Sequence, residues 1–411
     1  MMERSKCMKM PKIRFNDFKN EWKKEKLCNI VSRITRKNKN LESHTPLTIS
    51  AIEGLVSQLT YFNNIVASSN ISGYYLIKNG EFAYNKSYSN GFPYGSIKRL
   101  DKFDMGVLST LYIVFALNKQ NTSILSDYLV LFFNTTLWYH EVAKRAEEGA
   151  RNHGLLNISA DDFFDINIIY PKDLLGQQKI ASYFQKLESL IQTTSKKLAT
   201  LKRIKTASLQ SMFPQEGETV PKVRFKGFEE EWGKEKLGNL FKERIENNIN
   251  GELLSVTINN GIIKASDNGR FDNSNNDKSH YKVVKIGDIV YNTMRMWQGA
   301  SGYSAYEGIV SPAYTVIIPQ EQVFPLFFAY LFKTQSLINR FRIHSQGLTT
   351  DTWNLKFAGF SIIEVCFPKS KLEQQKIASY FCNLDKQISL QTQHLEKLKQ
   401  IKAACLDKMF V

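Results

Sequence analysis

The chain has 411 residues, of which 43% are hydrophobic and 23% charged, so it is long enough for two or three domains and is not a disordered polymer. A formal net charge of +16 at pH 7 predicts a polyanionic partner, with nucleic acid first and an anionic membrane surface second. Five scattered cysteines and the lack of long apolar runs argue against a disulfide framework, a structural zinc site and a membrane span, so we expect a cytoplasmic protein.

The chain opens with a block that occurs again in its middle. PKIRFNDFKNEWKKEKLCNI begins at Pro11, and PKVRFKGFEEEWGKEKLGNL begins at Pro221. The two copies keep Pro, Lys, Arg, Phe, Phe, Glu, Trp and the KEKL run in step. An internal repeat of this length predicts two related halves, so we assign 1–30 as an N-terminal conserved segment and 215–240 as its second copy.

Each block is followed by a stretch that differs between the halves. Residues 31–171 and 241–368 share only a faint skeleton, such as GEFAYN at Gly80 and GDIVYN at Gly287. We therefore predict two variable domains that have a common framework and diverged surfaces.

The patterns within these stretches are mixed. Short apolar runs with turn residues around them predict strands within 280–292 and 313–319. Apolar residues at helical spacing predict amphipathic helices over 126–146 and 324–341.

A long helix follows each variable stretch. QQKIASYF occurs at Gln177 and again at Gln374, and about half of the positions aligned from there on are identical. Both segments alternate apolar steps of four and three, which is the pattern of a coiled-coil seam. The seam positions are Ile180, Phe184, Leu187, Ile191, Leu198, Leu201, Ile377, Phe381, Leu384, Ile388, Leu395 and Leu398. Two matched seams most simply bury each other, so the helices of 172–214 and 369–411 are predicted to pair antiparallel.

Two details of these helices are also expected. Residues 370–373 have the spacing of a capping box at the start of the second helix. At Lys205 and Lys402 the apolar spacing is interrupted, and we expect the seam to move onto Ile204 and Ile401 with the lysines in water.

These elements together predict an α+β protein with a pseudo-twofold internal repeat. It has two α/β domains in tandem, separated by two long helices that pair as an antiparallel coiled coil. The net charge is +5 in 1–30, +5 in 172–240 and +4 in 369–411, but only +1 in each variable stretch, 31–171 and 241–368. Nucleic-acid binding by the variable domains would therefore need basic groups gathered on one face.

Motifs for catalysis are missing. We find no P-loop, no GxGxxG and no HExxH, and the scattered histidines and cysteines form no nucleophile or metal constellation. SPAY at Ser311 resembles part of a base-binding methyltransferase motif, but it lacks the first Asn and the second Pro, so a structural strand is the favoured interpretation. We predict no catalytic residue, no metal site and no cofactor in this chain.

Base edges are read by Arg, Lys, Asn, Gln and Thr side chains and by apolar atoms. Such residues gather with glycines in four loops, 85–99 and 145–157 in the first half and 292–303 and 345–354 in the second. Ordinary surface loops are the competing interpretation for any one residue. The candidates for DNA contact are Asn85, Lys86, Tyr88, Lys98, Arg99, Arg151, Asn152, His153, Asn292, Thr293, Arg295, Trp297, Gln298, Gln346, Thr349, Thr350 and Trp353.

The doubled P-K-(I/V)-R-F-x-x-F-x-x-E-W block, variable domain and QQKIASYF helix resemble the specificity subunits of type I restriction–modification systems over essentially the whole chain. The resemblance implies that each variable domain is a target-recognition domain for one half of a bipartite, asymmetric site in double-stranded DNA. It also implies that the helices set the spacing and dock two modification (methyltransferase) subunits, which restriction/translocase subunits join. S-adenosylmethionine, ATP and magnesium would belong to those partners.

Other readings remain open from the residues alone. A non-catalytic coiled-coil adaptor would present two protein-binding domains and would show no salt-sensitive preference among DNA duplexes. A fused methyltransferase would transfer methyl groups by itself. RNA could replace DNA as the partner, although no aromatic RNA-binding motif favours it.

Overall fold

The computed structural model describes residues 11–18, 22–120, 123–146, 156–258, 260–268, 277–350 and 352–410. The chain forms two compact units, unit 1 from residues 1–193 and 395–411 and unit 2 from residues 194–394. Helices α5 (Leu174–Ser211) and α10 (Lys371–Lys408) have 38 residues each, and each of them contributes residues to both units. No helix among the described residues is long and apolar enough to cross a membrane.

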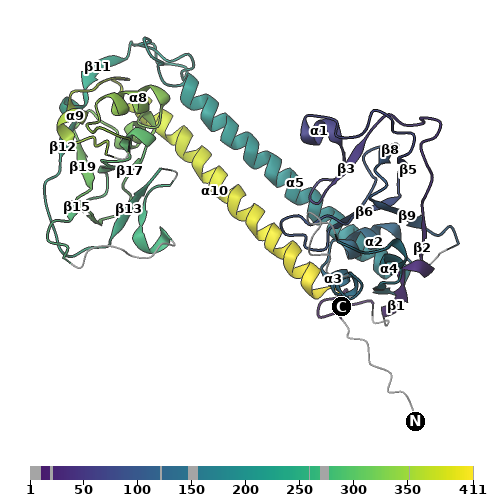
Figure 1. Ribbon diagram of the computed structural model, residues 1–411. Helices are drawn as coiled ribbons and strands as arrows, with labels where there is room; N and C mark the ends of the chain where they lie inside the picture. The colour runs from purple at the N-terminus through teal and green to yellow at the C-terminus, as the bar shows by residue number, and fades with distance from the viewer. Residues whose placement is uncertain are drawn as a thin grey trace. The chain divides into compact units, whose positions relative to one another are not determined.

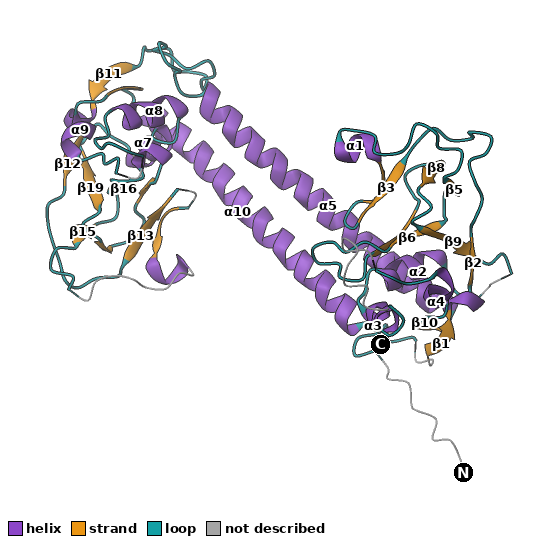
Figure 2. Ribbon diagram, viewed as in Figure 1, coloured by secondary structure: helices purple, strands orange, loops and turns teal. Residues whose placement is uncertain are grey.

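Unit 1 contains a four-stranded antiparallel sheet of order β2-β9-β6-β7 and three two-stranded ladders, β1-β10, β3-β4 and β5-β8 (Figure 2). Its strands are β1 (Trp22–Lys26), β2 (Val31–Arg33), β3 (Leu47–Ser50), β4 (Gly54–Ser57), β5 (Tyr75–Lys78), β6 (Phe82–Asn85), β7 (Ser96–Arg99), β8 (Met105–Leu108), β9 (Ile113–Leu117) and β10 (Asn167–Pro171). Its short helices are α1 (Gln58–Phe62), α2 (Ser126–Phe133), α3 (Leu137–Ala143), α4 (Ala160–Phe164) and the 3-10 turn Leu27–Asn29.

Unit 2 repeats this topology strand for strand, with a sheet of order β12-β19-β16-β17 and the ladders β11-β20, β13-β14 and β15-β18. Its strands are β11 (Gly233–Lys236), β12 (Phe241–Glu243), β13 (Leu254–Thr257), β14 (Gly261–Lys264), β15 (Lys282–Val284), β16 (Ile289–Asn292), β17 (Ser301–Tyr303), β18 (Gly308–Val310), β19 (Tyr314–Pro319) and β20 (Glu364–Phe367). Its short helices are α6 (Leu237–Leu240), α7 (Pro325–Leu331), α8 (Gln335–Ile343) and α9 (Phe357–Ser361), with 3-10 turns at Ala265–Asn268 and Met296–Gln298.

Strand periodicity sends alternate side chains of the central sheet into two cores. In β16, Ile289 and Tyr291 join the core with the helices, whereas Val290 joins the smaller core with β13, β14 and β18. In β6, Tyr84 and Ala83 divide in the same way. The two variable stretches therefore fold in the same way although their sequences differ. In both, alternate side chains of the central strands are buried in opposite cores.

The two expected amphipathic helices are each divided. The helix predicted over 126–146 breaks between α2 and α3, and that over 324–341 breaks between α7 and α8. At each break a threonine hydroxyl donates to the carbonyl three residues back, Thr135 to Phe132 at 2.7 Å and Thr334 to Leu331 at 2.8 Å. Such a bond takes a carbonyl that a continuing helix would use, so the chain turns there.

The long helices pack antiparallel, and each unit shows it separately (Figure 1). In unit 1 the start of α5 lies against the end of α10, with the ring centroids of Phe184 and Phe410 6.1 Å apart. In unit 2 the end of α5 lies against the start of α10, where Phe213 stacks on Phe381 at 5.7 Å. Most seam side chains are buried, and Ile191 and Ile388 are half-buried.

The expectation for the seam lysines is wrong. Ile204 and Ile401 are 41% and 37% exposed, whereas both lysines turn toward the partner helix. Lys205 donates to Asp385 and Lys402 donates to Glu188, each at 2.5 Å. An acidic residue at the same place in both helices allows a lysine to lie beside the seam with its charge paired, which helical spacing alone does not reveal.

The capping box is only half formed. The amide of Glu373 lies 3.4 Å from the Ser370 hydroxyl, which accepts its hydrogen bond. The Glu373 carboxylate is 1% exposed and turns to Arg224 instead. A guanidinium is a stronger hydrogen-bond partner for a buried carboxylate than a backbone amide is. The Glu373 side chain therefore binds Arg224 and not the amide at the start of the helix.

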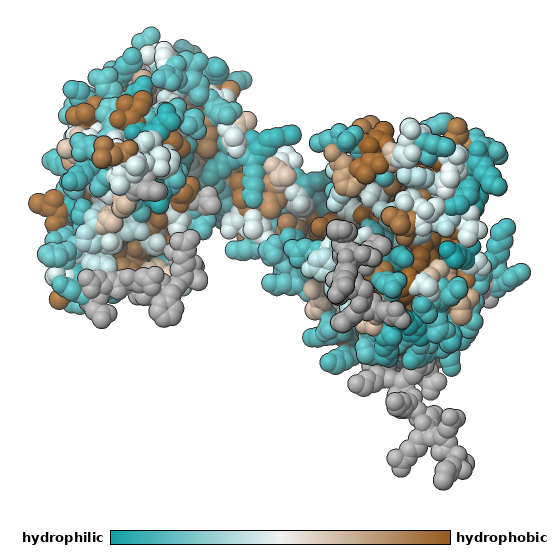
Figure 3. All heavy atoms as spheres, in the orientation of Figure 1, coloured by the Kyte–Doolittle hydropathy of each residue, from teal (hydrophilic) through white to brown (hydrophobic). Residues whose placement is uncertain are grey.

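Polar side chains cover much of the face in Figure 3, and apolar ones gather around α1 of unit 1. There Leu59, Tyr61 and Phe62 are 59, 48 and 47% exposed.

Candidate nucleic-acid interface

Two loops that are far apart in the sequence are joined by the same backbone hydrogen bond in both units. In unit 2 the amide of Leu355 donates to the carbonyl of Thr293 at 2.8 Å, and in unit 1 the amide of Leu156 donates to the carbonyl of Lys86 at 3.0 Å. Thr293 and Lys86 occupy equivalent places, each directly after the central strand of its sheet. We call each joined pair a loop junction: residues 292–300 with 345–355 in unit 2, and residues 85–95 with 156–157 in unit 1.

The first loop of the unit 2 junction is held by its own side chains. Thr293 is buried, and its hydroxyl donates to the Ala313 carbonyl at 2.8 Å. The amide of Met294 donates to the Asn292 side chain at 3.0 Å, and the Trp297 indole donates to the Met294 carbonyl at the same distance. Arg295 is exposed on this loop, whereas Asn292, Trp297 and Gln298 are half-buried. The Arg295 guanidinium is therefore exposed on a loop whose backbone is held in place by hydrogen bonds.

The second loop of this junction is a small closed hairpin. Gln346 and Asn354 exchange two backbone hydrogen bonds, of 3.0 and 2.8 Å, and the Thr352 hydroxyl accepts from the Thr349 amide at 3.0 Å. Gln346, Thr349 and Thr350 are exposed, and Leu348 at the tip is fully exposed. The hairpin thus offers amide, hydroxyl and apolar groups together.

An aromatic contact ties the two loops together a second time. The rings of Trp297 and Trp353 meet edge to face at 5.2 Å. On the same loop, the Gly299 carbonyl accepts from Lys333, which also donates to the Ile258 carbonyl at 3.1 Å. Gly299 has a φ of +82°, which a side chain would strain, so this turn depends on glycine.

The unit 1 junction carries different side chains. Tyr88 is 60% exposed, and Asn85 accepts from the Ser87 amide at 3.0 Å. The Lys86 ammonium donates to the Ile158 carbonyl at 3.2 Å, and burial lowers the pKa of this lysine. The candidates Arg151, Asn152 and His153 lie outside the described residues.

Lys98 and Arg99 are not brought to this junction. They stand at the far end of the β6–β7 pairing, where Arg99 is opposite Phe82, while the loop begins beyond Asn85. Lys98 donates to Asn134 at 2.9 Å, and burial together with the charge of Lys402 lowers its pKa to about 8. The Arg99 guanidinium binds two carboxylates, Asp101 at 2.6 Å and Asp127 at 2.7 Å.

Two exposed residues of the unit 2 junction were not among the sequence candidates. Leu348 and the 42%-exposed Met294 carry apolar atoms to the surface beside polar base-reading groups. Apolar side chains contact the methyl group of thymine. No sequence signal marks them, because an apolar residue in a loop is equally well explained by burial.

The SPAY segment at Ser311 has a structural role at the start of a strand of the central sheet. The Ala313 carbonyl accepts from both the amide and the hydroxyl of Thr293, and Tyr314 begins β19. Over the part of the chain that the structure describes, no three His, Cys, Asp or Glu side chains are grouped to hold a metal ion.

Comparisons with known proteins agree with this geometry. Residues 229–400 match the family model of the type I restriction modification DNA specificity domain. A sequence comparison with curated proteins found no match. The chain is similar in structure to the S subunit of a type I restriction–modification system from M. genitalium, with 13% identity, 98% of this chain and 99% of that chain covered, and a TM-score of 0.60.

Two further structures are similar over most of the chain. The HsdS subunit from Thermoanaerobacter tengcongensis has 14% identity, covers 96% of this chain and 97% of its own, and has a TM-score of 0.46. A chain from a structure on complex assembly and conformational transition of the type I restriction–modification system has 14% identity, coverage of 96% and 99%, and a TM-score of 0.48.

The second half is thus a DNA specificity domain, a protein class that chooses DNA sequences rather than altering them. The first half repeats its strand order, and the whole chain has the S-subunit fold. The chain therefore combines a type I restriction–modification DNA specificity domain in residues 229–400 with the fold of an S subunit over its whole length. This confirms the resemblance and replaces the adaptor, methyltransferase and RNA alternatives. Within the family this subunit is non-catalytic and carries no cofactor of its own.

Proposed function

We propose that each β-rich domain reads one half of a bipartite, asymmetric site in double-stranded DNA, and that its loop junction makes the base contacts. The observation that carries this proposal is the shared hydrogen bond of the two junctions, Leu355 to Thr293 and Leu156 to Lys86. A common framework that holds different exposed side chains is what two readers of different half-sites need. The recognition domains proposed are residues 31–171 and 241–368.

In the unit 2 junction the exposed groups cover several kinds of base edge. Arg295 suits the two acceptors of guanine, Gln346 suits adenine, and Leu348 suits the thymine methyl group. Thr293 and Trp353 hold the loops, and we assign them to positioning. In unit 1 the exposed ring of Tyr88 takes the corresponding place.

The helices of 172–214 and 369–411 are proposed to set the gap between the half-sites and to dock two modification subunits, which restriction/translocase subunits join. Their mutual seam and the Lys205–Asp385 and Lys402–Glu188 pairs support a rigid spacer. S-adenosylmethionine, ATP and magnesium are assigned to those partners. Removing one seven-residue unit from both helices should change the gap length, and an unchanged gap in an active complex would refute the spacer role.

A cytoplasmic location goes with this proposal. Chromosomal DNA is found there in a bacterial cell, and the four described cysteines are free thiols.

The recognition proposal is tested by mapping methylated sites in cells that carry the subunit with its modification subunit. Arg295→Ala should relax one base position in one half-site, since a good bidentate contact contributes about 1–3 kcal/mol of discrimination. The other half-site should stay unchanged. Arg342→Ala, at an exposed arginine of α8 outside the junction, is the matched control. A change in both half-sites, or the same change in the control, would refute the two-reader assignment.

Exchange of a whole domain gives a second, independent test. When residues 31–171 are replaced by the corresponding domain of another family member, only one half of the methylated target should change.

A further inference from the structure

A polar cleft of about 850 Å³ lies within unit 2, beside the paired helices. Lys202 and Lys205 line it from α5, and Ser389 and Gln393 line it from α10. In each helix these residues are three or four positions apart, so they share one face of that helix. Asn260 lines the cleft from the turn between β13 and β14. Two helices and a strand turn thus enclose one polar space.

The cleft has a positive net charge. Asp385 is the acidic residue in its lining, and both of its oxygens are bound: one accepts from Lys205 at 2.5 Å and the other from the Tyr330 hydroxyl at 2.9 Å. Lys202 is exposed and forms no ion pair with a described residue. Two lysines and one aspartate leave a net charge of +1. The ammonium of Lys202 is therefore the charge that an anion in the cleft would meet.

Uncharged hydrogen-bond donors accompany the lysines. The side chains of Ser389, Gln393 and Asn260 are exposed and bring a hydroxyl group and two amide groups to the cleft. The phosphate oxygens of DNA are bound by Lys and Arg together with Ser, Thr, Asn and Gln side chains. The lining thus has the composition of a phosphate contact.

The cleft adjoins the loop junction of unit 2. The Lys333 ammonium donates to the Ile258 carbonyl at 3.1 Å and also to the Gly299 carbonyl. Ile258 belongs to the same strand turn as Asn260, and Gly299 lies on the junction loop that carries Arg295. One side chain therefore ties a wall of the cleft to the residues proposed to read bases. A duplex whose bases contact the junction would bring its backbone close to the cleft.

The internal repeat gives unit 1 the same strand turn with a different charge. The amide of Asn260 donates to the Thr257 hydroxyl at 3.0 Å, and the amide of Glu53 donates to the Ser50 hydroxyl at 3.1 Å. Glu53 is thus the equivalent of Asn260, and a carboxylate stands where unit 2 has an amide.

The helices differ in the same sense. Lys399 is the repeat equivalent of Lys202 and has an ion-pair partner in Glu396 at 3.0 Å, where unit 2 has Ala199. Unit 1 therefore has two carboxylates, Glu53 and Glu396, that unit 2 lacks at the equivalent positions. The positive charge at these positions is specific to unit 2.

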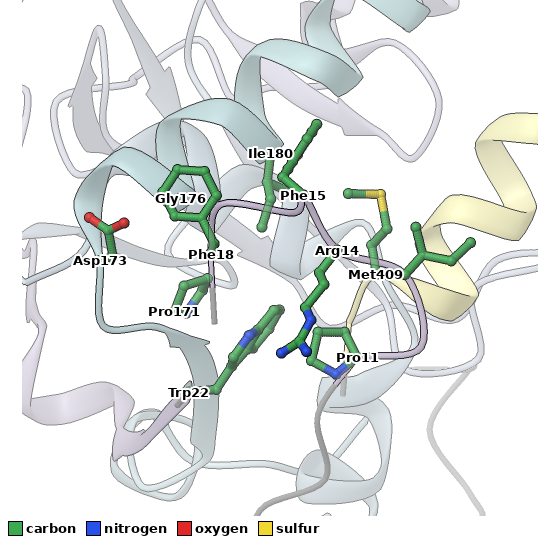
Figure 4. Close-up of a pocket in the computed structure, with 11 residues that line it drawn as sticks. Pro11, Arg14, Phe15, Phe18, Trp22, Pro171, Asp173, Gly176, Ile180 and Met409 are labelled. Carbon is green, nitrogen blue, oxygen red and sulfur yellow. The ribbon is translucent and has the colours of Figure 1, made fainter. Parts of the chain in front are cut away.

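The pocket at the start of α5 in unit 1 is of another kind (Figure 4). It encloses about 30 Å³, and Phe15, Phe18 and Ile180 form much of its wall. A space of this size holds little more than a water molecule, so it cannot admit a nucleic-acid backbone.

We infer that the cleft of unit 2 binds the phosphodiester backbone of DNA next to the half-site that this unit reads, with Lys202 as its main charged contact. The inference rests on the proposed base reading by the unit 2 junction, which the cleft adjoins. It gives the helices a direct part in DNA binding in addition to spacing. It also accounts for the basic excess of the helical segments, since the variable stretch 241–368 has a net charge of only +1.

The first test measures how the DNA affinity depends on salt. The full chain, assembled with its modification subunit, is titrated with a duplex that carries the mapped methylated site. Lys202→Gln should reduce the slope of log affinity against log salt concentration by about 0.9, which is the counterion release of one phosphate contact. Lys399→Gln, at the exposed lysine of the equivalent position, is the matched control and should keep the wild-type slope. The methylated target should be unchanged in both variants.

A second test locates the contact on the DNA. Single phosphates on either side of the half-site are replaced, one at a time, by the uncharged methylphosphonate. At the contacted phosphate the replacement should weaken binding of the wild type but not of Lys202→Gln, because both changes remove the same interaction. That phosphate should flank the half-site that Arg295→Ala alters.

A third test uses the residue that unit 1 has in the strand turn. Asn260→Glu should weaken DNA binding several-fold, because it places a carboxylate beside the phosphates. Asn260→Gln keeps an uncharged amide and should bind as the wild type does.

Three results decide against the inference. Lys202→Gln could keep the wild-type slope, or Lys399→Gln could lose as much slope as Lys202→Gln. Lys202→Gln could also weaken binding of the modification subunit with the salt slope intact, in which case an acidic segment of that partner occupies the cleft. Failure of the base-reading proposal is seen separately, since Arg295→Ala would then leave the target unaltered while the slope of Lys202→Gln still fell.

Discussion

The amide of Ile13 donates to the carbonyl of Lys408 at 3.0 Å, which ties the beginning of the described chain to its end. The equivalent bond in unit 2 runs from Val223 to Ser211 at 2.9 Å, between residues joined by a short connection. Both units therefore contain the same backbone hydrogen bond. In unit 2 it joins residues 12 positions apart, whereas in unit 1 it joins residues from opposite ends of the described chain.

This relationship predicts that the chain tolerates circular permutation. A short linker from residue 410 to residue 11, with new termini opened between 214 and 220, should leave the fold and the methylated target unchanged, because both ends stay in contact. Thermal unfolding and methylation mapping measure the two properties. New termini within α5, between 193 and 194, are the control and should disrupt folding. Loss of folding in the first permutant would show that the two junctions are not equivalent.

The helix seam should carry much of the stability of unit 2. Leu384 is 7% exposed, and Leu384→Ala should lower the free energy of unfolding by about 2–5 kcal/mol, through lost burial and a cavity. Leu390 lies on the same helix and is 54% exposed, so Leu390→Ala should change it by about 0.5 kcal/mol or less. Denaturant unfolding followed by circular dichroism compares them. If the two substitutions lowered the free energy of unfolding equally, Leu384 would not belong to the helix seam.

The Lys205–Asp385 pair should contribute specificity of helix pairing more than stability. The side chains are 29% and 40% exposed, so Lys205→Met should cost at most about 1 kcal/mol. Lys205→Glu should cost more, since it sets two carboxylates together, and Asp385→Lys in the same chain should recover part of that loss. Urea unfolding of the wild type, Lys205→Glu, Asp385→Lys and the chain with both of the last two changes forms a double-mutant cycle. Strictly additive effects would mean that the two charges do not interact.

The stability of unit 2 should rise with pH above neutrality because of Lys333. Burial and the nearby charge of Lys205 lower the pKa of Lys333 to about 8 from its ordinary 10.5. Between these values the folded state binds fewer protons than the unfolded state, so the free energy of unfolding increases with pH. Below pH 8 the buried charge costs stability in full.

Lys333→Met tests this assignment. It should reduce the pH dependence between 8 and 10.5 by up to about 1.4 kcal/mol per pH unit, as read from urea unfolding across that window. Lys356→Met, at an exposed lysine, is the control and should leave the dependence intact. An unaltered slope in Lys333→Met would show that this ammonium is solvated.

Much of the architecture could be predicted from local pattern. The two long helices have the predicted seam spacing, and strands lie within 280–292 and 313–319 as expected. These features repeat with the period of a helix or a strand, so a short window of residues contains them. The doubling of the fold is equally visible, since the blocks at Pro11 and Pro221 are identical at 12 of their 20 positions.

Only the tertiary structure decided the rest, because it depends on contacts between distant residues. The junction of Lys86 with Leu156 joins positions about 70 residues apart, and the junction of Thr293 with Leu355 joins positions about 60 residues apart. The full exposure of Leu348 is likewise a property of the folded loop. The seam lysines turn inward because Glu188 and Asp385 meet them from the other helix. Periodicity describes one element at a time, whereas a site is made where several elements meet.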